Sequence, residues 1–265
     1  MILTFTITFF VLGLVIGSFL NVIICRYNTG KSLGGKSACM SCQNKLRWYE
    51  LVPLFSFVAL QGRCKTCKTK ISIAYPLVEL ATGLIFLALF LKFKNLFFIN
   101  TFIFTVTYAY YAIMFSLLVV ITAYDLRHKI IPDALSFIFG ILAFAGLFLF
   151  TSYGFYPHIP SVSEFSGAVI ALPLTLFWLI SRGTWMGLGD AKLAIGIGWL
   201  LGLSGALSGL VIAFWSGAIV GICLVVLSKN RKIGKMGMKS EIPFAPFLVF
   251  GAFVAFIFEL NFFVI

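Results

Sequence analysis

Two aspartates stand out as candidates for chemistry, because acidic residues are scarce in this chain. Only eight of its 265 residues are Asp or Glu. Asp190 follows two glycines in the segment Trp185-Met-Gly-Leu-Gly-Asp-Ala-Lys192, directly ahead of an apolar run, and Asp125 ends another long apolar run. An acidic side chain beside a bilayer is costly unless it is used or neutralised. We therefore expect these two carboxylates to meet at one membrane face.

A confined pair of carboxylates has a well-defined chemistry. Like charges a few ångström apart cannot both be ionised, so the pair shares one proton. One carboxylate acts as a general base on a water molecule while the protonated one donates to a carbonyl oxygen, which cleaves an amide without a covalent intermediate. Because His128 and His158 are the only histidines, a Ser-His site or a zinc-hydrolase site has few candidates.

Structural roles compete with this interpretation. Asp is a preferred helix N-cap, so Asp190, which Lys192 follows, could cap the next helix, and Asp133 could cap another. Asp125 is harder to explain in this way, because it lies at the C-terminal end of an apolar run, where a helix dipole disfavours an anion. Glu79 falls about one turn inside an apolar run; it is a functional candidate, although an ion pair with a loop Arg would also account for it.

Four cysteines form two Cys-x-x-Cys pairs in the first long polar segment. Cys39 and Cys42 are separated from Cys64 and Cys67 by 21 residues. This spacing is typical of a tetrahedral zinc site, and four thiolates close the metal shell, which makes such a site structural. A pair of disulfides is the alternative, but it is disfavoured in a reducing compartment. The sequence predicts structural zinc.

The elements that position these residues are membrane helices. The chain is 61% hydrophobic and 11% charged, against about 25% charged residues in soluble domains, and apolar runs of about 17–25 residues can span a bilayer. We predict an all-α polytopic membrane protein whose first run is a retained helix. The eight candidate spans are 2–25, 74–91, 97–124, 134–151, 165–181, 191–203, 205–228 and 244–264.

The basic residues set the orientation of these spans. In an eight-helix arrangement 18 of the 20 Lys and Arg fall on one side, in the connections 26–73, 125–133, 182–192 and 229–241. The positive-inside rule makes this side cytoplasmic. Both Asp125 and Asp190 then face the cytoplasm. The same pattern explains the net charge of +12 through topology and anionic lipid, so we expect membrane lipids and no nucleic acid as partners.

One apolar stretch inside the cysteine-bearing loop, residues 48–60, is too short and too proline-broken to span a bilayer. We expect it to lie at the membrane surface, with Trp48 and Tyr49 at the level of the lipid headgroups.

Several motifs together resemble the bacterial type IV prepilin peptidases, a family of membrane aspartic peptidases. They are Gly17-Ser-Phe-Leu-Asn-Val22, the two cysteine pairs with Gly62-Arg63 and Tyr75-Pro-Leu-Val-Glu79, Asp125-Leu-Arg-His-Lys-Ile-Ile-Pro-Asp133, Gly187-Leu-Gly-Asp-Ala-Lys-Leu193 and Ile242-Pro-Phe-Ala-Pro-Phe247. The family usually carries Gly in place of Ala245. Presenilin-like proteases share the Gly-x-Gly-Asp motif, but this chain lacks their Pro-Ala-Leu signature.

The resemblance implies cleavage of the basic leader of prepilins and pseudopilins at the cytoplasmic face of the bacterial inner membrane. It also implies N-methylation of the new N-terminus with S-adenosylmethionine, since members with the cysteine-bearing loop generally have that activity. The loop and the cytoplasmic ends of the first two helices, including Glu79, are where we expect the methyl donor, whose binding residues stay unassigned. The residues expected to support the catalytic pair Asp125 and Asp190 are Gly187, Gly189, Lys192, Pro132, Asp133 and Glu79.

Three other functions compete with this one. A peptidase without methylation would share the aspartates, a transporter would need carboxylates at mid-membrane, and a zinc-dependent assembly factor would not need Asp190. The expected domain layout is a first transmembrane helix at 1–25, a cysteine-bearing cytoplasmic loop at 26–73 and a membrane-embedded peptidase core at 74–265.

Overall fold

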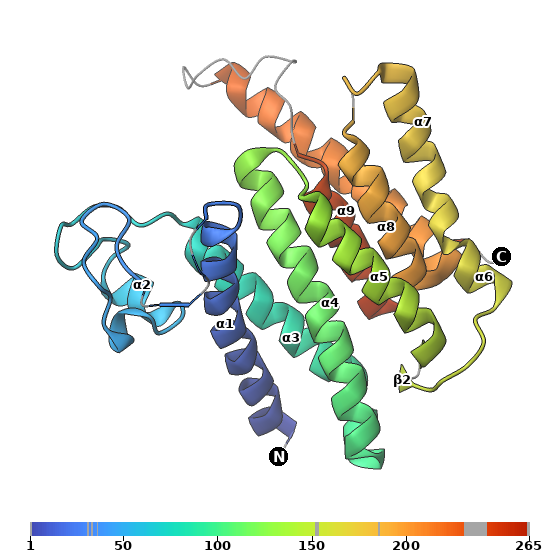
Figure 1. Ribbon diagram of the computed structural model, residues 1–265, viewed down its shortest axis with the longest axis horizontal. Helices are drawn as coiled ribbons and strands as arrows, with labels where there is room; N and C mark the ends of the chain where they lie inside the picture. The colour runs from blue at the N-terminus through green and yellow to red at the C-terminus, as the bar shows by residue number, and fades with distance from the viewer. Residues whose placement is uncertain are drawn as a thin grey trace. The chain divides into compact units, whose positions relative to one another are not determined.

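The computed structural model describes residues 2–30, 32, 34–35, 37–151, 154–184, 186–230 and 243–263. These residues are mostly helical and divide into two compact units, residues 1–123 and 124–265, with the division inside one helix. The helices of each unit can be followed by label and colour in Figure 1. Trp185, Ile242 and the basic residues Lys31, Lys36, Arg231, Lys232, Lys235 and Lys239 lie outside the described part.

The first unit holds helices α1 and α3, most of α4 and a loop between α1 and α3. Their bounds are α1 Ile2–Arg26, η1 Trp48–Glu50, α2 Phe55–Ala59, α3 Ala74–Ile99 and α4 Thr101–His128. Asn100 separates α3 from α4: its backbone is extended, and its side-chain oxygen accepts the N–H groups of Phe102 and Ile103 at 3.0 and 3.2 Å. The chain therefore ends one apolar helix and caps the next with a single polar residue.

Helices α1 and α3 pack closely because α1 carries small residues at the contact. A Cβ on Gly13 would lie 2.7 Å from the Cβ of Phe86, and one on Gly17 would lie 2.8 Å from the Cα of Glu79. The Gly-xxx-Gly spacing thus lets the two backbones approach, as in other membrane helix pairs. Aromatic rings from α1, α3 and α4 fill the rest of this unit, with Phe9 stacked on Phe90 at 4.6 Å between ring centroids.

The second unit is built on a long helix, α8. The remaining elements are α5 Asp133–Leu149, β1 Phe150–Thr151, β2 Gly154–Phe155, α6 Val162–Phe165, η2 Ser166–Ile170, α7 Ala171–Ser181, α8 Leu188–Asn230 and α9 Ala245–Phe258. The two short strands pair antiparallel. Helix α8 contacts α5, α9 and η2 most extensively, and Gly167 of η2 and Gly198 of α8 bring their backbones together.

Five helical segments of the described chain are long and apolar enough to cross a membrane: Ile2–Arg26, Ala74–Ile99, Thr101–His128, Val162–Ser181 and Leu188–Val226. Helices α5 and α9 are shorter apolar helices. The runs expected at 191–203 and 205–228 form one helix, α8, with non-helical backbone angles at Gly202. The predicted helical membrane fold is confirmed in this form.

Candidate active site and candidate metal centre

Asp125 lies near the C-terminal end of α4 and is buried, with 4% of its surface exposed. Its carboxylate accepts the backbone N–H of Ala245, the first residue of α9. The N-terminus of a helix presents unpaired N–H groups and the positive end of the helix dipole. The N-terminus of α9 therefore stabilises the Asp125 carboxylate, whereas the C-terminal end of α4 destabilises a negative charge.

Asp190 lies in the first turn of α8 and is also buried, with 7% of its surface exposed. The helix begins at Leu188, so Asp190 is its third residue, and the suggestion that it is the N-cap is wrong. Its side chain accepts the N–H of Gly187, as an acidic residue does in a capping box. The second carboxylate oxygen, Oδ1, is buried and has no hydrogen-bond partner among the described residues.

These two carboxylates belong to the same unit and lie close enough for their charges to interact. Four other acidic residues of the described chain have a polar partner within 3.0 Å: Glu50, Glu79, Asp133 and Glu164. Among the acidic residues that the structure describes, Asp190 alone combines burial, a neighbouring carboxylate and an unpartnered oxygen. A buried polar atom without a partner costs roughly 1–3 kcal/mol, and such a pair can hold and transfer one proton.

The residues around the pair fix the α4–α5 turn against the start of α8. A Cβ on Gly189 would lie 2.9 Å from the Cβ of Ile131, so only glycine permits this approach without a shift. Pro132 is the N-cap residue of α5 and Asp133 its first residue, which corrects the expectation that Asp133 is the cap. Asp133 instead forms an ion pair with Lys192, 2.6 Å between Oδ1 and Nζ.

The four cysteines are arranged as two matching turns. The N–H of Cys39 donates to the carbonyl of Asn44, and the N–H of Gln43 donates to the carbonyl of Cys39, both at 3.0 Å. Twenty-five residues later, Cys64 forms the same two bonds with Thr69 and Lys68. Gln43 and Lys68 both have positive φ, at 57° and 58°. The same fold of the backbone is therefore made twice.

These turns bring four thiols to one place. All four sulfur atoms lie within 4.8 Å of one another, and no disulfide joins them. The Sγ atoms of Cys39 and Cys67 are 3.7 Å apart, while a tetrahedral zinc ion with Zn–S bonds of about 2.3 Å requires about 3.8 Å. The Thr69 hydroxyl and N–H donate to Cys67 and lower the pKa of its thiol to about 6. The site fits a divalent metal that binds thiolates.

Comparison with known proteins identifies the family. The model of the bacterial peptidase A24 N-terminal domain matches residues 11–93, and that of the type IV leader peptidase family matches residues 112–222. A protein named prepilin leader peptidase/N-methyltransferase from Myxococcus xanthus is 33% identical over 89% of this chain and 67% of its own length. One of the same name from Xanthomonas campestris is 30% identical over 92% of this chain and 88% of its own.

The chain belongs to the type IV leader peptidase family. A further relative of the same name, from Bacillus subtilis, is 29% identical over 94% of this chain and 92% of its own length. No solved structure gave a significant match. Family membership makes the chain an enzyme and confirms the resemblance drawn from its motifs.

Glu79 of this leader peptidase lies in the other unit from the aspartates, and its contacts there are with the loop and α1. One carboxylate oxygen accepts the N–H of Leu54 at 2.9 Å, and the Ser18 hydroxyl donates to the same side chain. Leu54 has φ 56° and ψ −48°, and the N–H of Phe55 bonds the carbonyl of Pro53 across it at 2.6 Å. Glu79 thus holds a strained γ-turn in place.

Sequence reasoning missed two residues of the second unit. Ala245 appeared only as a departure from a family motif, although its N–H holds Asp125. Ser136, one turn into α5, is 4% exposed, and its hydroxyl has no partner among the described residues. No local pattern marks either residue, because a backbone donor and a buried serine become visible only when the helices are packed.

Proposed function

We propose that this enzyme cleaves the basic leader from prepilins and pseudopilins by a two-aspartate mechanism, with Asp125 and Asp190 as the catalytic pair. The observation that carries the proposal is the buried pair itself, whose charges interact. The names of the relatives support the substrate class. A prepilin has a basic leader and an apolar helix, so its helix can lie in the bilayer and deliver the junction to the site.

In the proposed reaction one carboxylate removes a proton from water, whose oxygen attacks the scissile carbonyl carbon. The other, protonated, carboxyl donates its proton to the carbonyl oxygen. The resulting tetrahedral gem-diol collapses as a proton passes to the leaving amine nitrogen and the C–N bond breaks. The unpartnered Oδ1 of Asp190 is available for one of these transfers. Gly187 and Gly189 leave room for an extended substrate backbone.

We further propose the cytoplasmic membrane as the location, with eight spans and the site facing the cytoplasm. Helix α8 has 43 residues, which at about 1.5 Å each is roughly 65 Å, against a hydrocarbon core of about 30 Å. The break at Gly202 therefore supports two crossings by α8. Six further crossings are proposed for α1, α3, α4, α5, α6–α7 and α9, which gives eight spans in all. The proposed domain layout is then a first span at 1–25, a cytoplasmic loop at 26–73 and a membrane-embedded core at 74–265.

The second proposed activity is methylation of the new N-terminal amine, with S-adenosylmethionine as co-substrate. The names of the relatives and the cysteine-bearing loop support it. The amine nitrogen takes the methyl group from the sulfonium donor and releases a proton to solvent. Glu79 is already occupied by Leu54 and Ser18, so its proposed part is to hold the loop rather than to bind the donor.

We propose zinc as the metal of the four cysteines, in a structural role. A closed shell of four thiolates leaves no position for a catalytic water. Cys39, Cys42, Cys64 and Cys67 would be the ligands. A zinc ion bound by them would join the two turns into one module.

The test is cleavage of a purified prepilin by the enzyme in detergent, read as intact mass. Wild type should release the leader, and Asp125→Asn and Asp190→Asn should not. The mass of one methyl group should appear on the product only when S-adenosylmethionine is present. Cleavage at the wild-type rate by either variant would refute the catalytic pair, and cleaved product that stays unmethylated would refute the second activity alone.

A further inference from the structure

The loop between α1 and α3 exposes large apolar side chains on η1 and α2. Trp48 is 80% exposed, Phe55 70% and Val58 73%. Phe55 and Val58 are three residues apart on α2 and so share one face. The other side of the short helix is used internally: Ser56 is buried, and its hydroxyl donates to the carbonyl of Tyr49 at 2.8 Å. In the described part of the loop, Phe55 and Val58 therefore remain largely exposed.

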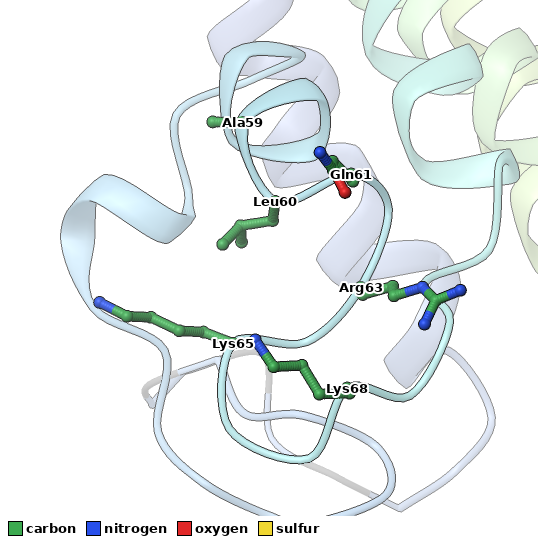
Figure 2. A pocket seen from close by; sticks show the side chains of 6 residues that line it. All are labelled: Ala59, Leu60, Gln61, Arg63, Lys65 and Lys68. Atoms are coloured by element: carbon green, nitrogen blue, oxygen red, sulfur yellow. The ribbon is translucent and has the colours of Figure 1, made fainter.

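A basic pocket adjoins this apolar face. Its volume is about 510 Å³, and its lining is Ala59, Leu60, Gln61, Arg63, Lys65 and Lys68. Ala59 is the last residue of α2, so the pocket begins where the apolar face ends. In Figure 2 the Leu60 side chain and the stems of Lys65 and Lys68 face one hollow. The lining of this pocket therefore combines apolar side chains with three basic residues.

One of the three basic residues of this pocket, Lys65, has its contacts with Tyr49 rather than with the four cysteines. Lys65 donates to the Tyr49 hydroxyl at 3.2 Å, and its ammonium lies 5.1 Å from the centre of that ring. Arg47 donates to the same hydroxyl at 3.2 Å. The Lys65 ammonium thus turns toward the apolar segment η1, where it and the pocket cations can meet an external anion.

We propose that this loop surface, made of Trp48, Phe55, Val58 and the basic pocket, docks on an anionic lipid bilayer with a lipid phosphate group in the pocket. The loop starts at the end of α1 and stops at the start of α3, two helices long and apolar enough to cross a membrane, so a bilayer surface is always within reach. Trp favours the headgroup layer, and Lys and Arg favour anionic lipid. A basic leader peptide is repelled by the same cations.

The test places the whole enzyme in nanodiscs whose acyl chains carry bromine, which quenches nearby tryptophan. Emission of Trp48 is the difference between wild type and Trp48→Phe. We expect strong quenching of Trp48 in discs that contain phosphatidylglycerol and weak quenching in pure phosphatidylcholine. Lys65→Gln/Lys68→Gln should lower the docking constant by about 25-fold, since each basic residue near an anionic surface contributes a factor of about five. The phosphatidylglycerol fraction at half-maximal quenching should rise accordingly.

The matched control is Lys45→Gln/Lys70→Gln, which removes the same charge from exposed loop positions outside the pocket. It should leave the quenching curve unchanged, and zinc content should be equal in all variants. Equal quenching in both lipids, or equal loss in both double variants, would overturn the anionic pocket. Iodide dissolved in the buffer quenches tryptophan that is exposed to water. If neither the brominated lipid nor iodide quenches Trp48, the surface is covered by a protein partner, and membrane docking is overturned. The test does not depend on peptidase activity, so its failure leaves the proposed function standing.

Discussion

Replacement of Asp190 by Asn separates a catalytic role from a capping role. Asn has nearly the same shape as Asp, and its side-chain oxygen can still accept the N–H of Gly187 that Asp190 now accepts. The cap is thus weakened by no more than about 1 kcal/mol, which shifts the melting temperature by only about 2–4 °C in a chain of this size. The amide at position 190, however, can no longer take up or release a proton, so the pair loses one of its two proton-transfer groups. General acid–base catalysis by one group contributes about 10²–10⁴ in rate.

Glu164 provides the matched control. It is the third residue of α6, and its carboxylate accepts the N–H of Ser161 at 2.7 Å. Its position in its own helix therefore matches that of Asp190, but it has no acidic neighbour in the described chain with which to share a proton. Glu164→Gln should cost a similar amount of stability and leave the cleavage rate unchanged.

Single-turnover cleavage of a prepilin in detergent, with the melting temperature of each variant, measures both effects. Asp190→Asn should lose at least 100-fold in rate, about 2.7 kcal/mol in activation free energy. The double variant Asp125→Asn/Asp190→Asn should be no slower than the single one, because residues that act as a unit are not additive. Folded Asp190→Asn with more than a tenth of the wild-type rate would refute the pair, as would parallel losses in Asp190→Asn and Glu164→Gln.

Three further results are expected. Gly198→Ala should destabilise the enzyme by about 1–3 kcal/mol because its Cβ would overlap the η2 backbone, whereas Gly140→Ala, with open space around it, should stabilise by up to about 1 kcal/mol; thermal unfolding would show it. Glu79→Ala should raise the rate of hydrogen exchange at the Leu54 amide at least about tenfold, because a hydrogen bond to a charged acceptor stabilises the closed state by about 1.5–3 kcal/mol. An exchange rate unchanged from wild type would contradict the proposal that Glu79 holds the γ-turn. In metal-free enzyme the Cys67 thiolate forms as pH rises through about 6, so alkylation followed by mass spectrometry should be half-maximal there rather than near the usual pKa of about 8.5.

The cluster of four cysteines was the part most completely predictable from sequence. A Cys-x-x-Cys pair dictates its own local turn, since the bonds that shape it join residues four and five apart, as Cys39 does with Gln43 and Asn44. Two such turns need only a flexible connection to meet. The membrane helices were predictable for a similar reason, because hydrophobic runs are local and the bilayer thickness sets their length. The runs predicted as the sixth and seventh spans form one helix, whose kink at Gly202 lies two residues before the predicted boundary.

The surroundings of the aspartates were not predictable in the same way. The sequence offered a helix N-cap as the alternative role of Asp190, because Asp favours that position. Two residues of α8 precede Asp190, and its side chain accepts the N–H of Gly187 from inside the helix. That Asp125 would find its donor at the start of α9 required knowing which helix ends meet. Hydrophobic periodicity carries no such information when all helices are apolar on every side, and the contact joins residues 120 positions apart.

The physical case for catalysis rests on what the protein tolerates at Asp190. A capping role would be served by a side chain whose free oxygen reaches solvent, or by one whose carboxylate accepts several hydrogen bonds, as in Glu164. Asp190 satisfies neither condition, because it is buried, beside another carboxylate, with Oδ1 unpartnered. Each of these features destabilises the fold. The proposed reaction would use this free oxygen, and it would therefore account for a buried aspartate at this position.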